Sequence, residues 1–213
     1  MFAVINEDFM NYLFFDTETT GVPKDYKAPP SVVDNWPRIV QLSWILQDER
    51  ENVLSEGNFI VKPEGFEIPE EAANVHKITT DIALEQGQPL KKVMRHFTTA
   101  LQLANVVVGH NIHFDASVVG AEFYRLCGQN CLEAWPLMDT MKPLTEFCAI
   151  PNKWNNGYKW PTLQELHMKL FESEFDGAHD ASADVKATAR CFWELKKNGV
   201  ITDPENIQLH NSK

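Results

Sequence analysis

The stretch at residues 12–21, YLFFDTETTG, restricts the possible folds more than any other part of the chain. Its first four residues are apolar with no helical period, which is typical of a strand covered on both faces. Side chains alternate along a strand, so Asp16 and Glu18 should point to the same side. Two such carboxylates repel each other and are costly to desolvate. A divalent cation would turn the repulsion into coordination, whereas a solvated strand end with a chance pair of acids would need none.

Length and composition set the scale of the fold. The chain has 213 residues, of which 44% are hydrophobic, and this is enough for one sizeable core. We expect a single domain over residues 1–213, with its core at roughly residues 10–197 and short extensions at both ends.

The cellular compartment is predicted from what the sequence lacks. No stretch is long and apolar enough to cross a bilayer, and the first eight residues have no secretory pattern. The cysteines form no C-x-x-C pair and are expected to be free thiols: Cys127, Cys131, Cys148 and Cys191. We therefore expect a cytoplasmic protein with no membrane partner.

The charge balance argues against a broad electrostatic grip on nucleic acid. The chain carries 30 acidic and 19 basic residues, for a formal net charge of −11. Proteins that hold nucleic acid by charge usually present a basic face. The acids could instead gather where metal ions neutralise them. Composition alone points away from a nucleic-acid partner, and the arrangement of the acids has to decide.

Hydrophobic periodicity predicts an α/β fold. Strands are expected at residues 12–15, 38–46, 53–61, 106–108 and 135–140, and helices at residues 70–75, 79–84, 89–103, 114–127, 162–171 and 180–196. Short connections between the first three strands predict an antiparallel meander. Alternation of strands and helices in the second half predicts parallel crossovers. The expected result is a mixed five-stranded sheet with helices on both faces.

A second polar junction lies at residues 109–115, GHNIHFD, where an apolar strand gives way to a helix. Asp115 falls in the first turn of that helix, where an acid can be a cap, a dipole partner or a ligand. His110 and His113 suggest a zinc site, but no other His or Cys lies at useful spacing. We therefore interpret His113 as a surface residue. Asp139, at the end of the strand predicted at residues 135–140, is interpreted as a cap for the helix that follows.

A third junction lies at residues 177–184, GAHDASAD, where a glycine-containing loop enters a helix. His179 lies at or just before the helix start, and Asp184 lies inside the helix. Small residues around an acid let the helix approach the sheet, which would bring Asp184 against the end of the first strand. Considered alone, His179 could be a polar cap.

Together, these motifs resemble the DEDDh exonucleases, which are DnaQ-like 3′–5′ exonucleases of the ribonuclease-H-like superfamily. The matching segments are FDTETTG at residues 15–21, GHN and FD within residues 109–115, and HDA followed by an acid within residues 179–184. VHKIT at residues 75–79 resembles a segment between the motifs. Members include the epsilon proofreading subunit of bacterial replicative polymerase, oligoribonuclease and ribonuclease T. The resemblance spans roughly residues 12–195 and implies a ribonuclease-H-like fold.

The resemblance implies a metal-dependent 3′–5′ exonuclease that releases nucleoside monophosphates from DNA or RNA. Two Mg²⁺ or Mn²⁺ ions, roughly 3.5–4 Å apart, would be held by Asp16, Glu18, Asp115 and Asp184. Asp16 would bridge both ions. His179 would be the general base, because an imidazole with an ordinary pKa of about 6.5 suits that role.

The same resemblance implies a nucleic-acid substrate with a free 3′ end, single-stranded in form. Its terminal nucleotide would face Thr17, Thr19, Thr20 and Gly21, whose backbone N–H and hydroxyl groups would reach the sugar. Val22 and Phe114 are candidates for apolar contact with the end bases. Further substrate candidates are His76, His110 and Asn111. Ordinary packing or capping explains each of these outer residues equally well.

The segment at residues 151–161, PNKWNNGYKWP, departs from the compact family pattern. It interleaves aromatic residues with lysines, which could stack bases and touch phosphates. The alternative is a loop pinned to its own domain by Trp154 and Trp160, and the sequence favours this alternative.

Two other classes of function stay open. A non-catalytic nucleic-acid-binding or polymerase-associated module would not need the complete set of four acids and a histidine. A zinc metallohydrolase would use His110 and His113. The chain ends soon after its last predicted helix, which favours a free-standing repair or degradation enzyme over a proofreading subunit. The sequence does not separate DNA from RNA, or a monomer from a homodimer or a polymerase-associated subunit.

Overall fold

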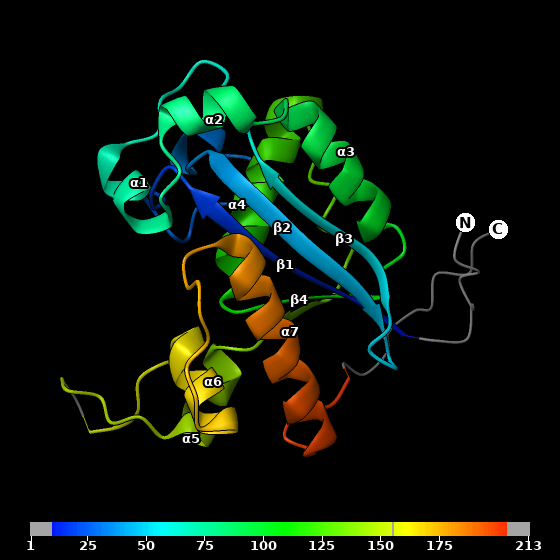
Figure 1. Cartoon of the computed structure of the whole chain (residues 1–213), viewed down its shortest axis with the longest axis vertical. Coiled ribbons are helices and arrows are strands. Elements are labelled where there is room, and N and C mark those ends of the chain that lie inside the picture. Colours follow the sequence, from blue (N-terminus) through cyan, green and yellow to red (C-terminus); the bar gives the residue numbers. More distant parts are fainter. Residues whose placement is uncertain (1–9, 155, 204–213) are drawn as a thin grey trace.

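The computed structural model describes residues 10–154 and 156–203, and a five-stranded sheet lies at its centre (Figure 1). The strands are β1 (Asn11–Thr19), β2 (Ile39–Asp48), β3 (Val53–Ile60), β4 (Val106–Gly109) and β5 (Leu137–Asp139). Their order across the sheet is β3-β2-β1-β4-β5. The β1–β2 and β2–β3 pairs are antiparallel, and the β1–β4 and β4–β5 pairs are parallel. The predicted mixed sheet is confirmed.

Helices cover both faces of this sheet, also as predicted. They are α1 (Glu70–His76), α2 (Thr80–Gln86), α3 (Leu90–Leu101), α4 (Ile112–Cys127), α5 (Thr145–Cys148), α6 (Leu163–Phe171) and α7 (Ala181–Lys197). In Figure 1, α7 crosses one face with α5 and α6 beside it, and α3 and α4 lie behind the other. Contacts of α7 with β1, β2 and α6 agree with this arrangement.

The apolar run of β1 supplies core residues to both faces of the sheet. Phe14 faces α7, where its ring centroid lies 5.2 Å from that of Phe192. Phe15 faces α3 on the opposite side. Side chains alternate along a strand, so the series that faces α7 continues beyond the apolar run to Asp16 and Glu18. The core packing of β1 therefore fixes the direction in which these two acids point.

A buried ion cluster fixes the loop that follows β1. Glu122 of α4 is fully buried and accepts from Arg38 Nε at 2.8 Å, with Arg125 Nη1 3.1 Å from the same oxygen. Arg38 is in turn paired with Thr20: each backbone N–H donates to the other residue, Thr20 N to Arg38 O and Arg38 N to Thr20 Oγ1, both at 3.0 Å. The ion cluster thus holds the end of β1 against α4.

Most differences from the predicted element boundaries have local causes. The helix predicted from residue 114 begins at Ile112, directly after Asn111, whose left-handed φ of 66° forms the bend into the helix. The strand predicted at residues 135–140 is only three residues long. Two 3₁₀ segments, Val33–Asn35 and Lys142–Leu144, and α5 were not predicted, because three or four residues are too few to show a helical period. The expected chain ends before residue 10 and after residue 203 lie outside the described residues.

The structure can be compared with two predictions, on the cysteines and on membrane-spanning segments. All four cysteines are free thiols, as expected. Across residues 10–154 and 156–203, none of the helices has both the length and the apolar character needed to span a bilayer.

Candidate active site

Three carboxylates from two distant parts of the chain meet at the end of β1. Asp16 and Glu18 point to the same side of the strand, as predicted, and Asp184 approaches them from the first turn of α7. One oxygen of each lies within 4.8 Å of the other two. All three side chains are half-buried. Small residues on both sides of Asp184, including Ala181 and Ala187, let α7 pack closely enough for this approach.

Asp115 is the fourth acid, and it is held by β1 itself. It lies in the first turn of α4, as predicted, and is 4% exposed. Its Oδ1 accepts from the Thr17 backbone N–H at 3.1 Å and from the Thr17 hydroxyl at 2.6 Å. Its charge is close enough to raise the pKa of Asp16. The sheet end thus gathers acids from β1, α4 and α7.

Burial raises the pKa of all four acids, and the charges of neighbouring carboxylates raise it further. Burial is the largest cause, and it raises the pKa of Glu18 to about 8 and that of Asp184 to about 6. The pKa of Asp115 rises to about 7, although hydrogen bonds from Thr17 oppose the rise. The pKa of Asp16 lies well above its ordinary value, through burial and then through the neighbouring carboxylates. This cluster fits a divalent cation, because carboxylate oxygens are the ligands that Mg²⁺ and Mn²⁺ prefer.

The raised pKa values predict that the metal-free protein loses stability as the pH rises. In the unfolded chain these acids ionise at about pH 4, whereas folded Glu18 ionises only at about pH 8. Between these limits the folded state binds more protons, so the free energy of unfolding should fall by several kcal/mol as the pH rises. Urea denaturation in EDTA at pH 5 and pH 8 should measure the loss, and Mg²⁺ should restore stability mainly at pH 8.

Glu18→Gln is the matched variant for this measurement. It keeps the shape of the side chain and removes its charge, so its metal-free stability should fall less between pH 5 and pH 8. If the wild-type protein and Glu18→Gln showed the same pH dependence without metal, the description of the acids as a mutually repelling cluster would be wrong.

His179 lies on the loop that leads into α7. Its backbone φ of 69° is left-handed, and its N–H donates to Asp184 Oδ2 at 3.1 Å. Its side chain is exposed. The next residue, Asp180, caps α7 by accepting from the backbone N–H of Ser182 at 2.9 Å and of Ala183 at 3.2 Å. The helix cap is therefore Asp180, and the imidazole of His179 is not needed for it.

Gln41 anchors the start of α7 to the sheet, and the sequence analysis did not single it out. It is the β2 residue paired with Glu18 and is 3% exposed. Its Oε1 accepts from the Ala181 N–H at 3.2 Å, and its Nε2 donates to Asn58 Oδ1 at 2.9 Å and Asp180 Oδ2 at 3.4 Å. The available signal was an amide within a strongly apolar strand, which must find partners when buried.

The residues predicted to face the terminal nucleotide are engaged mainly within the protein. The prediction placed the Thr17 N–H and hydroxyl at a sugar, but both donate to Asp115. The Thr19 hydroxyl donates to Gly21 O at 2.7 Å, and the Thr20 hydroxyl accepts from a loop N–H. Gly21 has a φ of 145° and open space where a Cβ would stand. These contacts shape the turn after β1, and Gly21 is the residue of this turn that has free space beside it.

An apolar rim borders this turn. Val22 is 70% exposed, and Phe114 is half-buried at the start of α4. Tyr26, which is not among the predicted site residues, is 64% exposed, and its ring centroid lies 6.5 Å from that of Phe114. An exposed aromatic in a proline-rich loop was the signal that could have identified Tyr26. Val22 and Phe114 remain candidates for base contact, and Tyr26 joins them.

The three remaining substrate candidates are held inside the protein. His76 is buried at the end of α1, where burial lowers its pKa and the nearby Thr19 backbone opposes the shift. Asn111 forms the left-handed start of α4, and its N–H donates to Asp139 Oδ1 at 2.8 Å. Asp139 also accepts from the Met141 N–H at 2.9 Å. It was predicted to cap the helix that follows, but Met141 is the N-cap of the next 3₁₀ segment and Leu144 is that of α5, so Asp139 instead bonds the backbone before them.

His110 is held on both sides of its ring. Its Nε2 lies 3.0 Å from Pro161 O, and its Nδ1 lies 3.1 Å from Thr140 Oγ1. Because a carbonyl only accepts, Nε2 carries the proton, while Nδ1 lies beside a Thr140 hydroxyl that also contacts Gly109 O at 3.3 Å. His113 is exposed, as predicted. The zinc alternative therefore loses the His110 ring as a ligand, and the metal-binding group among the described residues consists of carboxylates.

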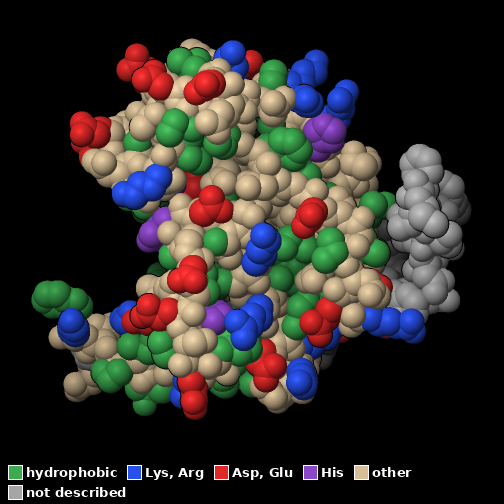
Figure 2. Space-filling model, viewed as in Figure 1, with side chains coloured by type: hydrophobic (Ala, Val, Ile, Leu, Met, Phe, Trp, Pro, Cys, Tyr) green, Lys and Arg blue, Asp and Glu red, His purple; other side chains and the backbone are tan. Residues whose placement is uncertain are grey.

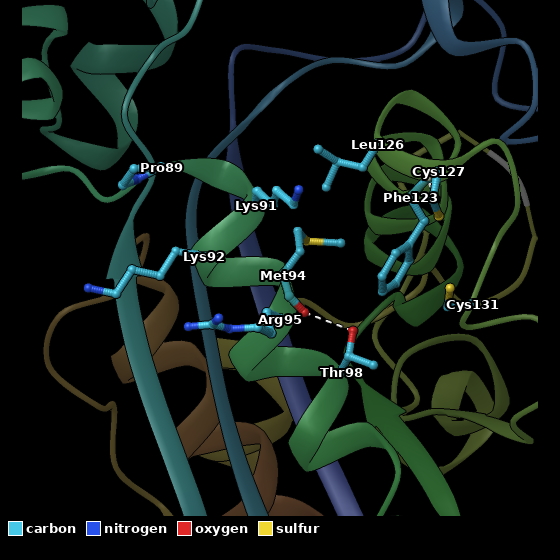
Figure 3. A pocket seen from close by; sticks show the side chains of 10 residues that line it. All are labelled: Pro89, Lys91, Lys92, Met94, Arg95, Thr98, Phe123, Leu126, Cys127 and Cys131. Carbon is cyan, nitrogen blue, oxygen red and sulfur yellow. Dashed lines mark hydrogen bonds between the residues drawn. The ribbon is translucent and has the colours of Figure 1, made fainter.

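The surface around the acids is hollowed. Figure 2 shows a notch at one side of the molecule, between the region of α1 and the region of α5 and α6, and the arrowhead of β1 lies on that side in the same view of Figure 1. A separate cavity of about 660 Å³ lies between α3 and α4 (Figure 3). Its lining includes Met94, Phe123, Cys127 and Cys131 but none of the four acids. The two hollows are therefore distinct features.

The mixed sheet of order β3-β2-β1-β4-β5, with helices on both faces and acids of β1 and α7 meeting at its end, is the ribonuclease-H-like α/β fold expected from the sequence. The chain belongs to the exonuclease family: the RNase_T family model, described as "Exonuclease", matches residues 13–192. The resemblance to the DEDDh exonucleases is thereby confirmed. No curated protein is detectably similar in sequence.

Solved structures of exonuclease I share this fold. The Escherichia coli enzyme in complex with a dT13 oligonucleotide aligns with a TM-score of 0.68 at 22% identity, over 88% of this chain and 41% of that one. Its zinc-ion-bound complex with single-stranded DNA gives 0.66 at 23% identity, over 89% and 41%. Exonuclease I from Methylocaldum szegediense gives 0.68 at 22% identity, over 88% and 40%. The chain thus spans about two fifths of the length of these proteins.

Proposed function

We propose that the chain is a metal-dependent 3′–5′ exonuclease that hydrolyses terminal phosphodiesters of DNA or RNA and releases nucleoside monophosphates. The observation that carries the proposal is the meeting of Asp16, Glu18 and Asp184, whose carboxylate oxygens lie within 4.8 Å of one another. Membership of the exonuclease family supports it. We further propose that the chain acts as one exonuclease domain with its core at roughly residues 10–197.

The metal ligands of the proposal are Asp16, Glu18, Asp115 and Asp184, with Asp16 shared between two Mg²⁺ or Mn²⁺ ions. Bound there, the ions would supply a water of lowered pKa and charge compensation at the scissile phosphate. The chain holds the ligands in place from outside the cluster. Thr17 orients Asp115 through two hydrogen bonds, and Gln41 fastens the helix that carries Asp184.

His179 takes the proton from the attacking water in this proposal. Its exposed ring lies on the loop directly before α7, and its backbone N–H is tied to Asp184. A ring in this position can exchange its proton with solvent after each turnover. The proton would leave the water as the O–P bond forms and the 3′ oxygen of the preceding nucleotide departs.

A single strand with a free 3′ end is the substrate form that we propose. The chain has a net charge of −11, so it cannot rely on a broad basic face to hold a long duplex. The exonuclease I structures that share the fold were determined with dT13 and dA16 oligonucleotides, which supports a single-stranded substrate by analogy. The exposed Val22 and Tyr26 offer apolar surface for terminal bases.

The test is a ladder assay on matched DNA and RNA oligonucleotides with Mg²⁺. Substrate labelled at its 5′ end should yield a ladder of products shortened from the 3′ end, and 3′-labelled substrate should yield only labelled mononucleotide. A 3′-phosphate block should stop both. Release of mononucleotides from the 5′ end, or cleavage of a circular substrate, would overturn the proposal. Binding of the oligonucleotide without any cleavage would support the alternative of a non-catalytic module.

The cellular setting belongs to the proposal as well. We propose that the enzyme acts in the cytoplasm as a free-standing exonuclease in repair or degradation of nucleic acid. A homodimer or a complex with a polymerase is the alternative arrangement. Size-exclusion chromatography with light scattering would separate the monomer from the dimer.

A further inference from the structure

Residues 151–154 and 156–160, between α5 and α6, form a small hairpin, which we call the aromatic hairpin. Pro151 and Tyr158 form an antiparallel bridge. The Asn152 N–H donates to Gly157 O at 2.8 Å, and the Lys159 N–H donates to Ile150 O at 2.9 Å. The backbone of this segment is therefore ordered by its own hydrogen bonds, although it projects from the body of the molecule (Figure 1).

The aromatic side chains of the hairpin are not used for packing. Trp154 is 93% exposed, Trp160 is 57% exposed and Tyr158 is 43% exposed. The favoured expectation, a loop pinned to its domain by Trp154 and Trp160, is therefore wrong. The backbone bonds already fix the hairpin, so the rings are not needed to hold it. Large aromatic rings left exposed to water within one short segment are a sign of an interaction surface.

Lysines accompany these rings, and they have separate roles. Lys159 Nζ lies 2.6 Å from Glu165 Oε1, so it ties the hairpin to α6. Lys142 Nζ lies 5.0 Å from the centroid of the Trp160 ring. Lys153 is exposed next to Trp154 in the chain. On an acidic protein, this hairpin thus combines stacking surfaces with positive charge, which is the combination that single-stranded nucleic acid requires.

The base of the hairpin is connected to the candidate active site. His110, at the start of the loop that leads to Asp115, donates from Nε2 to the carbonyl of Pro161, the residue that follows the hairpin. The same end of α6 also holds the loop that contains His179, because Gln164, the second residue of α6, exchanges hydrogen bonds of 2.7 and 3.2 Å with the backbone of Phe175. The helix α6 therefore braces both the hairpin and the His179 loop.

We propose that the aromatic hairpin is a stacking platform for the single strand that leads to the 3′ end in the active site. The proposal rests on the proposed function. Bases of the incoming strand stack on Trp154 and Trp160, and their phosphates pair with Lys142 and Lys153. In Figure 2 the hairpin region borders the notch on the side of α5 and α6, so a strand lying on it is directed into the notch. Stacking supplies the affinity that the acidic surface does not.

The test measures binding apart from catalysis. A fluorescent oligothymidine of about twelve nucleotides is titrated with the full chain in EDTA, and Kd is read by anisotropy. Trp154→Ala should raise Kd about tenfold, and Trp154→Tyr should recover most of the affinity, because a tyrosine ring still stacks. Lys153→Ala should weaken binding less and reduce its salt dependence. Leu126→Ala is the matched control, since Leu126 is an exposed apolar residue in the distant cavity between α3 and α4.

A second assay separates failure of this proposal from failure of the proposed function. The p-nitrophenyl ester of thymidine 5′-monophosphate has no upstream strand whose bases could stack on the hairpin, so the proposal expects wild type and Trp154→Ala to hydrolyse it equally with Mg²⁺. A wild-type protein that hydrolyses the ester, together with an unchanged Kd in Trp154→Ala, would overturn the platform. An unchanged Kd with a change in oligomeric state would also overturn it and assign the hairpin to a protein interface. No hydrolysis by any protein would reject the enzyme and leave the platform to be judged by Kd alone.

Discussion

Replacing Asp16 with alanine should reduce Mg²⁺-dependent cleavage of a single-stranded oligonucleotide by at least about a thousandfold. The charges of Glu18, Asp115 and Asp184 all raise the pKa of Asp16, so Asp16 lies close to each of the other three acids. Its loss would remove the ligand proposed to be shared by both ions and several kcal/mol of transition-state stabilisation. Calorimetric titration with Mn²⁺ in the absence of substrate should show weaker metal binding as well.

The control for this experiment is Glu133→Ala, which removes an exposed acid from the loop before β5 and should leave rate and metal affinity unchanged. The metal-free Asp16→Ala protein should also be at least as stable as the wild type at pH 8, because one of the repelling charges is gone. Substantial Mg²⁺-dependent cleavage by folded Asp16→Ala would reject the assignment of the site.

The second large effect concerns His179. His179→Ala should lower turnover by roughly a hundredfold to ten-thousandfold, which is the usual contribution of a general base. Its metal affinity should stay close to that of the wild type, because the contact with Asp184 is made by the backbone N–H, which alanine keeps. Single-turnover rates and Mn²⁺ titrations of the same preparation would measure the two quantities side by side.

The pH profile provides an independent check on His179. The wild-type rate should rise over the pH range in which an imidazole loses its proton, and this rise should disappear in the variant. His179→Asn is a useful companion, because asparagine tolerates the left-handed backbone at this position and so isolates the loss of the ring from any change in the loop. A wild-type rate that is flat from about pH 5.5 to pH 8 would contradict the role of His179 as the base.

The acids could be predicted because the periodicity of β1 fixes their direction. An apolar run covered on both faces makes every second side chain point toward α7, and Asp16 and Glu18 continue that series. Asp184 could be placed because small residues around it on α7 allow close packing. In each case a local pattern with a fixed geometry determined the position in space.

The supporting residues could not be predicted, because their partners are set by the tertiary fold. Gln41 appears in the sequence as one amide in an apolar strand, and only the pairing of β1 with β2 places it beside Glu18 and below α7. Thr17 was assigned to the substrate through the family resemblance, whereas in the structure its backbone N–H and its hydroxyl both donate to Asp115. The aromatic hairpin was misjudged because sequence composition does not show whether a tryptophan packs or projects.

The site residues lie far apart in the sequence, and this determines when the acidic cluster can form during synthesis. The bond between Thr17 and Asp115 joins residues 98 positions apart, and the bond between Gln41 and Ala181 joins residues 140 positions apart. Asp184 lies on α7, the last of the described helices that pack on the sheet. A nascent chain therefore has no complete acidic cluster until α7 has left the ribosome and docked. The order of synthesis therefore delays the proposed nuclease activity until this domain is nearly folded.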